Sequence, residues 1–166
     1  MFGALDAETP VRVRENWERI KAEQERREGI FHHVPETLPA LLYARKLQRR
    51  AAAIDFEYPD AADALGDLDD ELRELREALA ESGEPAPEAE PDPHVFEELG
   101  DVLFAAVNVA RKLNVDPELA LRAMARRFAE RVERAEGLAA AGGEDFSTLS
   151  LEEKDRYFDA AKEQLH

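Results

Sequence analysis

The sequence predicts an all-α protein built as a helical bundle. Alanine, leucine, glutamate and arginine are abundant, and all four are strong helix formers. Apolar residues recur at intervals of three and four, whereas the alternation typical of strands is nearly absent. Helices are expected at about residues 9–28, 39–54, 61–81, 92–113, 116–141 and 151–164.

The boundaries of these six segments are marked by residues that cap or break helices. Three segments begin at an aspartate N-cap, two of them with proline at the first helical position, where no N–H is needed. The last begins at a capping box, and glycines end the first, third and fifth. The residues concerned are Asp60, Asp92-Pro93, Asp116-Pro117, Ser150 with Glu153, Gly29, Ser82-Gly83 and Gly142-Gly143, and Leu38-Pro39 opens the second helix.

Length, net charge and the lack of cysteine limit the kinds of protein that this chain can be. The 166 residues suit one domain, residues 31–166, preceded by a charged helical arm at residues 1–30. The net charge of −16 disfavours nucleic acid and anionic membranes as partners. The absence of cysteine excludes disulfides, thiolate zinc sites and cysteine nucleophiles. No apolar run suits a signal or a membrane span, so a soluble, cytoplasmic protein is expected.

Two pairs of carboxylates stand on neighbouring predicted helices. Glu71 and Glu74 flank a leucine seam in the third helix, and Glu98 and Asp101 lie in the fourth. With 38 acidic residues in the chain, acidic pairs three apart also arise by chance. Spacing alone therefore does not distinguish a site from a solvated helix face.

The fourth helix gives its acidic pair more weight. Apolar residues cover most of its circumference, which predicts a buried helix. Its polar residues, Glu98, Asp101, Asn108 and Lys112, share one stripe with Ala105. Facing carboxylate pairs would form an all-oxygen site suited to Mg²⁺, with Mn²⁺ as a second choice. A salt-bridge network is an equally good interpretation from chemistry alone, with cations drawn from Arg45, Lys46, Arg49, Arg111, Arg127 and Arg131.

Two further groups could contact a nucleotide. Arg127 and Arg131 share one face of the fifth helix, where guanidinium groups could bind phosphates or pair with nearby glutamates. Phe56 and Tyr58 lie in a loop between helices. A base could stack on them, although loop aromatics more commonly plug the end of a core.

Four ordered blocks resemble MazG-type nucleotide pyrophosphohydrolases. Glu71-x-x-Glu74 followed by Glu98-Leu-Gly-Asp101 is similar to the ExxE…ExxD signature of that family. The blocks at residues 38–58, 97–113, 126–136 and 149–162 resemble the surrounding helices. The likeness covers most of the chain and is closest to the C-terminal half of two-domain members.

The resemblance implies the all-α NTP pyrophosphatase fold, with a four-helix core completed by homodimerisation and a catalytic domain at residues 31–166. It implies Mg²⁺ held by Glu71, Glu74, Glu98 and Asp101, and hydrolysis of a nucleoside triphosphate to its monophosphate and pyrophosphate. It also places Asn108, Arg127 and Arg131 near the nucleotide or its phosphates, and Phe158 near the sugar or base. One departure is Asp67, which stands where the family often has lysine.

Three other functions remain open. A dUTP-, dCTP- or phosphoribosyl-ATP-specific pyrophosphohydrolase would share the fold. A non-enzymatic module could bind a protein partner through its acidic faces, without any need for Mg²⁺. A di-iron bundle is disfavoured because it requires two Glu-x-x-His motifs, and only Glu163-x-x-His166 occurs.

Overall fold

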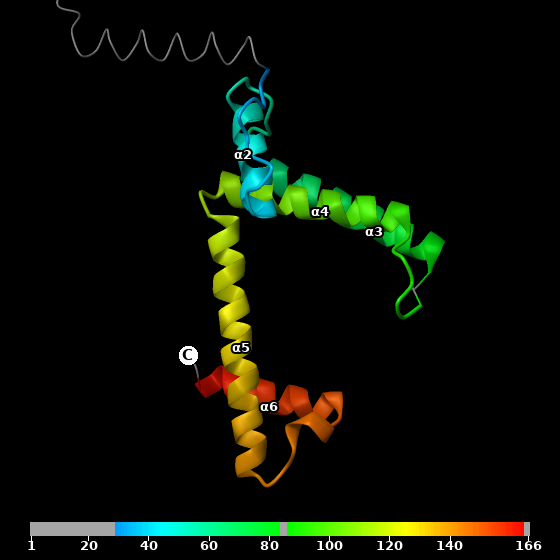
Figure 1. The fold of residues 1–166 in the computed structure, drawn as a ribbon, viewed down its shortest axis with the longest axis vertical. Helices are drawn as coiled ribbons and strands as arrows, with labels where there is room; N and C mark the ends of the chain where they lie inside the picture. The colour runs from blue at the N-terminus through cyan, green and yellow to red at the C-terminus, as the bar shows by residue number, and fades with distance from the viewer. Residues whose placement is uncertain (1–28, 84–85, 165–166) are drawn as a thin grey trace, which may run out of the picture. The chain divides into compact units, whose positions relative to one another are not determined.

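The computed structural model describes residues 29–83 and 86–164, and these ranges contain five α-helices, one short 3₁₀ helix and no strand (Figure 1). The all-α prediction is confirmed. The predicted helix at 9–28, and with it nearly all of the predicted arm at 1–30, lies outside the described residues. The chain divides into two compact units at Leu113 and Asn114, and each is described by itself.

The described part of the first unit contains three helices. They are α2 (Ala40–Ala52), α3 (Ala61–Ser82) and α4 (Pro93–Lys112). Figure 1 shows α3 and α4 side by side, while α2 crosses near the start of α3 and the end of α4. The pair α3 and α4 therefore brings the two predicted acidic motifs onto adjacent helices.

The predicted caps fix where α3 and α4 begin. The Asp60 carboxylate accepts hydrogen bonds from the backbone N–H groups of Ala62 and Asp63, at 2.8 and 3.0 Å. Asp92 accepts from the N–H groups of His94 and Val95, and Pro93 follows it as predicted. Helix α3 ends at Gly83, whose φ of 75° is costly for other residues. Helix lengths and boundaries thus follow from local chemistry.

Small side chains form the buried part of the first unit. Ala64 and Ala78 of α3 and Ala105 and Val107 of α4 are its fully buried apolar residues among those described. The prediction that α4 is a buried helix is wrong for the single chain. Its larger apolar side chains are exposed because, among the described helices, α2 and α3 alone pack on it; they are Phe96, Leu99, Leu103 and Phe104.

The second unit is a long helix partly covered by a shorter one. Helix α5 (Pro117–Ala141) leads through the 3₁₀ helix η1 (Phe146–Thr148) to α6 (Leu151–Gln164). Helix α6 packs on the C-terminal half of α5, and residues 119–130 of α5 are exposed. The predicted capping box is confirmed: the Ser150 N–H donates to the Glu153 carboxylate at 2.9 Å, and the Glu153 N–H donates to Ser150 Oγ at 3.3 Å.

Across the described residues, every helix is either too short or too polar to cross a membrane.

Candidate metal site and adjoining pocket

Three of the four motif carboxylates converge between α3 and α4. Glu71 and Glu74 lie one helical turn apart on α3, and Glu98 faces them from α4. One oxygen from each of the three side chains lies within 4.8 Å of the others. The Glu98 side chain is 13% exposed, whereas that of Glu74 is 48% exposed. The arrangement agrees with the sequence expectation that the two motifs face each other.

Asp101 lies near this triad without joining it. It is one turn after Glu98 on α4, and it is exposed. Its charge is nevertheless the strongest of those that raise the pKa of Glu71, ahead of Asp67, Glu74 and Glu98. Asp101 is therefore close enough to act on the triad electrostatically.

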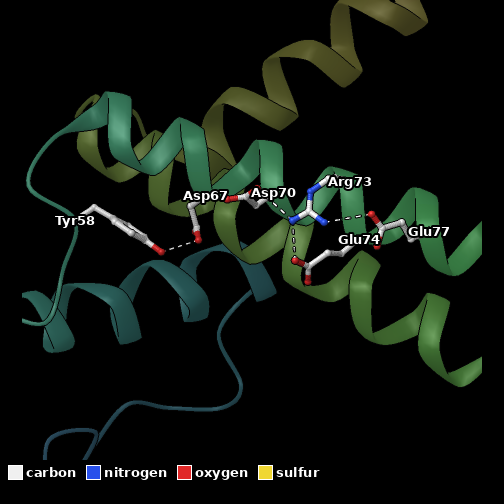
Figure 2. Close-up of polar contacts among 6 residues, drawn as sticks. All are labelled: Tyr58, Asp67, Asp70, Arg73, Glu74 and Glu77. Atoms are coloured by element: carbon white, nitrogen blue, oxygen red, sulfur yellow. Dashed lines mark hydrogen bonds and ion pairs between the residues drawn. The ribbon is translucent and has the colours of Figure 1, made fainter.

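Two cationic or titratable side chains contact the triad. Arg73 donates to Glu74 at 3.2 Å and also pairs with Asp70 and Glu77 along the outer face of α3 (Figure 2). His94 Nε2 lies 3.1 Å from Glu98. The Arg73 pairs are exposed, and exposed ion pairs contribute little to stability. No ion pair joins Glu71 or Asp101 to a cation within residues 29–83 and 86–164.

The triad has the chemistry of a hard-cation site. Burial raises the pKa of Glu71 above its ordinary value, and the neighbouring carboxylates raise it further. The charged form is thus disfavoured in the protein alone, because like charges are held together with incomplete solvation. A divalent cation would remove that repulsion, and carboxylate oxygens are the ligands that Mg²⁺ and Mn²⁺ prefer. The residues present therefore fit the metal that the resemblance implied.

A cavity of about 540 Å³ lies between α2, α4 and the loop that joins α2 to α3. This volume falls in the range of pockets that hold small ligands. The cavity wall is largely apolar, with a few polar groups among the aromatic ones. Its lining includes Phe31, Leu47, Gln48, Phe56, Phe104 and Asn108.

The loop aromatics belong to this cavity rather than to the core. Phe56 is 78% exposed, so it does not plug the end of the bundle. Tyr58 also lines the cavity, and its hydroxyl donates to Asp67 Oδ1 at 2.6 Å (Figure 2). Asp67 lines the cavity as well and precedes Glu71 by one turn of α3. The cavity and the carboxylate triad are therefore neighbours along one helix.

Gln48 is the one buried polar side chain among the described residues, at 6% exposure. Its Nε2 donates to the carbonyl of Phe104 at 2.8 Å, which links α2 to α4. Its Oε1 has no hydrogen-bond partner in the described part of the chain. A buried acceptor left in this state costs roughly 1–3 kcal/mol.

A second polar group holds the loop against the end of α4. Glu57 Oε2 accepts from Arg111 at 2.9 Å and pairs with Lys112 at 2.6 Å. Arg111 also donates to Asn108 Oδ1 through Nε and Nη2. The amide oxygen of Asn108 is thereby engaged, so its amide N–H₂ is the end left to meet a ligand.

We expect the Glu57 contact to stabilise the fold above mildly acidic pH. Hydrogen bonds from Lys112 and then Arg111 lower the pKa of Glu57 below its ordinary value of 4.5. A carboxylate with a depressed folded-state pKa adds stability above its unfolded pKa and loses it as pH falls through the folded value. The stability difference between the wild type and Glu57→Gln should be constant above about pH 5 and shrink below pH 4.5.

Urea unfolding at a series of pH values measures this difference. Glu36→Gln removes an exposed carboxylate that has no such partner among the described residues, and it serves as the control. A Glu57→Gln difference that grew with acidification would contradict the assignment.

The remaining predicted site residues lie in the second unit. Arg127 is exposed on α5, and its Nη2 lies 3.6 Å from Met124 Sδ. Neither Arg127 nor Arg131 forms an ion pair with a carboxylate of the described residues. The ring of Phe158 in α6 is tilted against the ring of Phe128, with 5.8 Å between their centroids. Lys162 Nζ lies 4.8 Å from the centroid of the Phe158 ring. Their predicted contacts with a nucleotide stay predictions.

Comparison with known proteins decides the family resemblance. The chain is 36% identical over 149 residues to the nucleoside triphosphate pyrophosphohydrolase/pyrophosphatase MazG of Thermotoga maritima, covering 88% of this chain and 54% of that protein. It is 30% identical over 171 residues to the nucleoside triphosphate pyrophosphohydrolase of Escherichia coli K12, covering 99% of this chain and 61% of that protein. The chain is similar in sequence to MazG proteins.

The predicted resemblance to MazG is thereby confirmed, and it extends over most of the chain. The chain spans about 54–61% of the length of these MazG relatives. It is also 37% identical over 151 residues to the uncharacterized protein YabN of Bacillus subtilis, covering 89% of this chain and 29% of that protein. No family model matches the chain.

Three polar groups at the site were not singled out by sequence reasoning. Gln48 had a usable signal, because it is a polar residue on the line Leu41, Ala44 and Ala51 of α2, where the pattern is otherwise apolar. The sequence carries no comparable signal for Glu57 or Arg73. One is an acidic residue in a loop, and the other is a basic residue on a charged helix face.

Proposed function

We propose that this chain hydrolyses nucleoside triphosphates to the monophosphate and pyrophosphate in a reaction that depends on Mg²⁺. The observation that carries the proposal is the convergence of Glu71, Glu74 and Glu98 from two helices beside a ligand-sized cavity. The names of the MazG relatives support the same reaction. Residues 31–166 are proposed as the catalytic domain.

In this proposal the four motif carboxylates hold the metal. Glu71, Glu74 and Glu98 supply the converged oxygens, and Asp101 joins them through a change of side-chain rotamer. Bound Mg²⁺ would neutralise the phosphate charge and acidify a water molecule. A triad carboxylate, with Glu74 as the candidate, accepts the proton of the attacking water. Water adds to the α-phosphorus while the bond to the bridging oxygen breaks, and pyrophosphate leaves.

The cavity provides the proposed site for the nucleoside. Phe56 offers an exposed ring on which a base can stack, and the Asn108 amide N–H₂ can donate to it. Arg127 and Arg131 carry guanidinium groups that form no ion pair with a carboxylate of the described residues, and guanidinium matches phosphate geometry. They stabilise the charge that spreads onto the phosphate oxygens, and Phe158 packs against the sugar or base.

We also propose that the chain acts as a homodimer. Bulky apolar side chains are exposed on both helices that carry the motifs; they include Leu65, Leu79, Leu99 and Leu103. Helix α5 exposes a further row, Leu121, Met124 and Phe128. Exposed apolar side chains that gather on one helix in this way are typical of an association surface. Sedimentation equilibrium should give twice the mass of the chain at micromolar concentration, and a single-chain mass would refute the dimer.

Product analysis tests the reaction directly. The protein is incubated with each NTP and dNTP, and with phosphoribosyl-ATP, with and without Mg²⁺. Equal amounts of monophosphate and pyrophosphate are expected, no orthophosphate, and no turnover in EDTA. Release of orthophosphate with a diphosphate would refute the reaction. No turnover together with no Mg²⁺ effect on melting temperature would favour the non-enzymatic interaction module.

A further inference from the structure

We propose that Asp67, held by Tyr58, reads the sugar of the nucleotide by accepting a hydrogen bond from a ribose hydroxyl. The inference rests on the proposed function and adds a specificity-determining residue to it. Its starting point is that Asp67 is the acidic residue of α3 that belongs to the cavity wall.

The position of Asp67 along α3 matches the position of the sugar along a nucleotide. The cavity lies on one side of it, and Glu71, the first carboxylate of the triad, follows one turn later. In a nucleoside triphosphate the sugar joins the base to the phosphates. With the base in the cavity and the phosphates at the triad, the group between them meets Asp67.

The chemistry of Asp67 suits a hydroxyl and not a phosphate. An ionised carboxylate is an acceptor only, so it repels phosphate oxygens and attracts O–H donors. Hydrogen bonds to a charged acceptor are stronger than those between neutral groups. Asp67 stands half-buried, where such a bond is partly protected from water.

Tyr58 fixes the carboxylate for this task. Its hydroxyl donates to Oδ1 at 2.6 Å, so that oxygen is engaged and Oδ2 is left to accept from a ligand (Figure 2). The same hydrogen bond raises the pKa of Tyr58, which keeps the phenol protonated as the donor. Tyr58 is thus a positioning residue that acts through Asp67.

The test compares sugars rather than bases. For one base that the enzyme accepts, kcat/KM is measured for the ribo-, 2′-deoxy-, 3′-deoxy- and 2′,3′-dideoxynucleoside triphosphates. The wild type should prefer the ribonucleotide to the dideoxynucleotide by at least ~10-fold, equal to about 1.4 kcal/mol. The single-deoxy substrate that shows the loss identifies the hydroxyl.

Substitutions test whether the preference for the ribonucleotide depends on Asp67 and Tyr58. Asp67→Ala should bring the ratio to within about threefold of unity, and Tyr58→Phe should lower it partway. Asp69→Ala removes an exposed carboxylate from the same turn of α3 and should leave the ratio unchanged. If these variants lowered the melting temperature but left the ribo-to-dideoxy ratio unchanged, the Tyr58–Asp67 hydrogen bond would have a structural role only, and the proposal would be refuted. A weaker Mg²⁺ requirement shared by all sugars would make Asp67 a metal ligand instead.

Measuring the binding of non-hydrolysable nucleotides makes this test independent of turnover. Dissociation constants of α,β-methylene analogues, ribo against dideoxy, give the same ratio for the wild type and Asp67→Ala. Absence of turnover by the wild type would refute the proposed reaction alone. Equal binding of both sugars by the wild type would refute the role of Asp67 alone.

Discussion

Glu98→Gln should reduce kcat/KM for the accepted nucleotide by at least ~10³-fold, which corresponds to about 4 kcal/mol of transition-state stabilisation. Glutamine has the same size but lacks the charge, so the proposed metal site would lose its anionic ligand from α4 while Glu71 and Glu74 remain. Steady-state kinetics at saturating Mg²⁺ measures the loss. Circular dichroism should show unchanged helical content, because Glu98 lies in the interior of a capped helix.

Metal binding separates this result from a general disturbance of the fold. In the wild type, Mg²⁺ should raise the melting temperature as a ligand of the folded state, and Glu98→Gln should remove that rise. Glu97→Gln is the matched control, because it changes the adjacent, exposed glutamate of α4. Wild-type kinetics in Glu98→Gln, or an equal loss in Glu97→Gln, would contradict the carboxylate site.

Arg127→Ala should lower kcat by about 10²–10³-fold, the range found when a preorganised group that stabilises transition-state charge is removed. The expectation follows from a guanidinium that has no carboxylate partner among the described residues and whose Nη2 lies 3.6 Å from Met124 Sδ. Mg²⁺ stabilisation should be retained, since the triad is unchanged. Single-turnover kinetics with excess protein isolates the chemical step.

Arg126→Ala provides the control for the loss of positive charge. Arg126 is the adjacent exposed arginine on α5, and it points to a different side of the helix. It should retain activity within about threefold. If both variants lose activity equally, the effect arises from net charge, and the specific role of Arg127 is refuted.

Helix positions were predictable from sequence because they depend on neighbouring residues. The side chains of Asp60, Asp92 and Ser150 each accept a hydrogen bond from a backbone N–H group two or three residues further along the chain. The residues that form each cap can therefore be recognised in a short stretch of sequence. The facing of Glu71 and Glu98 was predictable for a related reason. Helical periodicity fixes the face on which each side chain lies, and α3 and α4 follow each other directly in the chain, which favours their packing as neighbours.

Burial and side-chain partners were less predictable because they depend on groups distant in sequence. The apolar circumference of α4 indicated a helix covered on all sides, yet just two of the described helices pack on it. The triad contains Glu98 but not Asp101, because rotamers decide which oxygens meet. The pairing of Glu57 with Lys112 joins residues that no local pattern relates.

Two buried alanines lie on the same face of α3 as Glu71. Ala64 and Ala78 stand seven residues before and after it, and small side chains there allow a neighbouring helix to approach closely. Each carboxylate reaches from its helix by a fixed side-chain length, so we expect these small residues to influence the gap left for an ion. Mg²⁺ bonds to oxygen at about 2.1 Å and Ca²⁺ at about 2.4 Å. A bulkier residue at position 64 or 78 would widen the gap and shift the preferred ion toward the larger one, with every acidic ligand still in place.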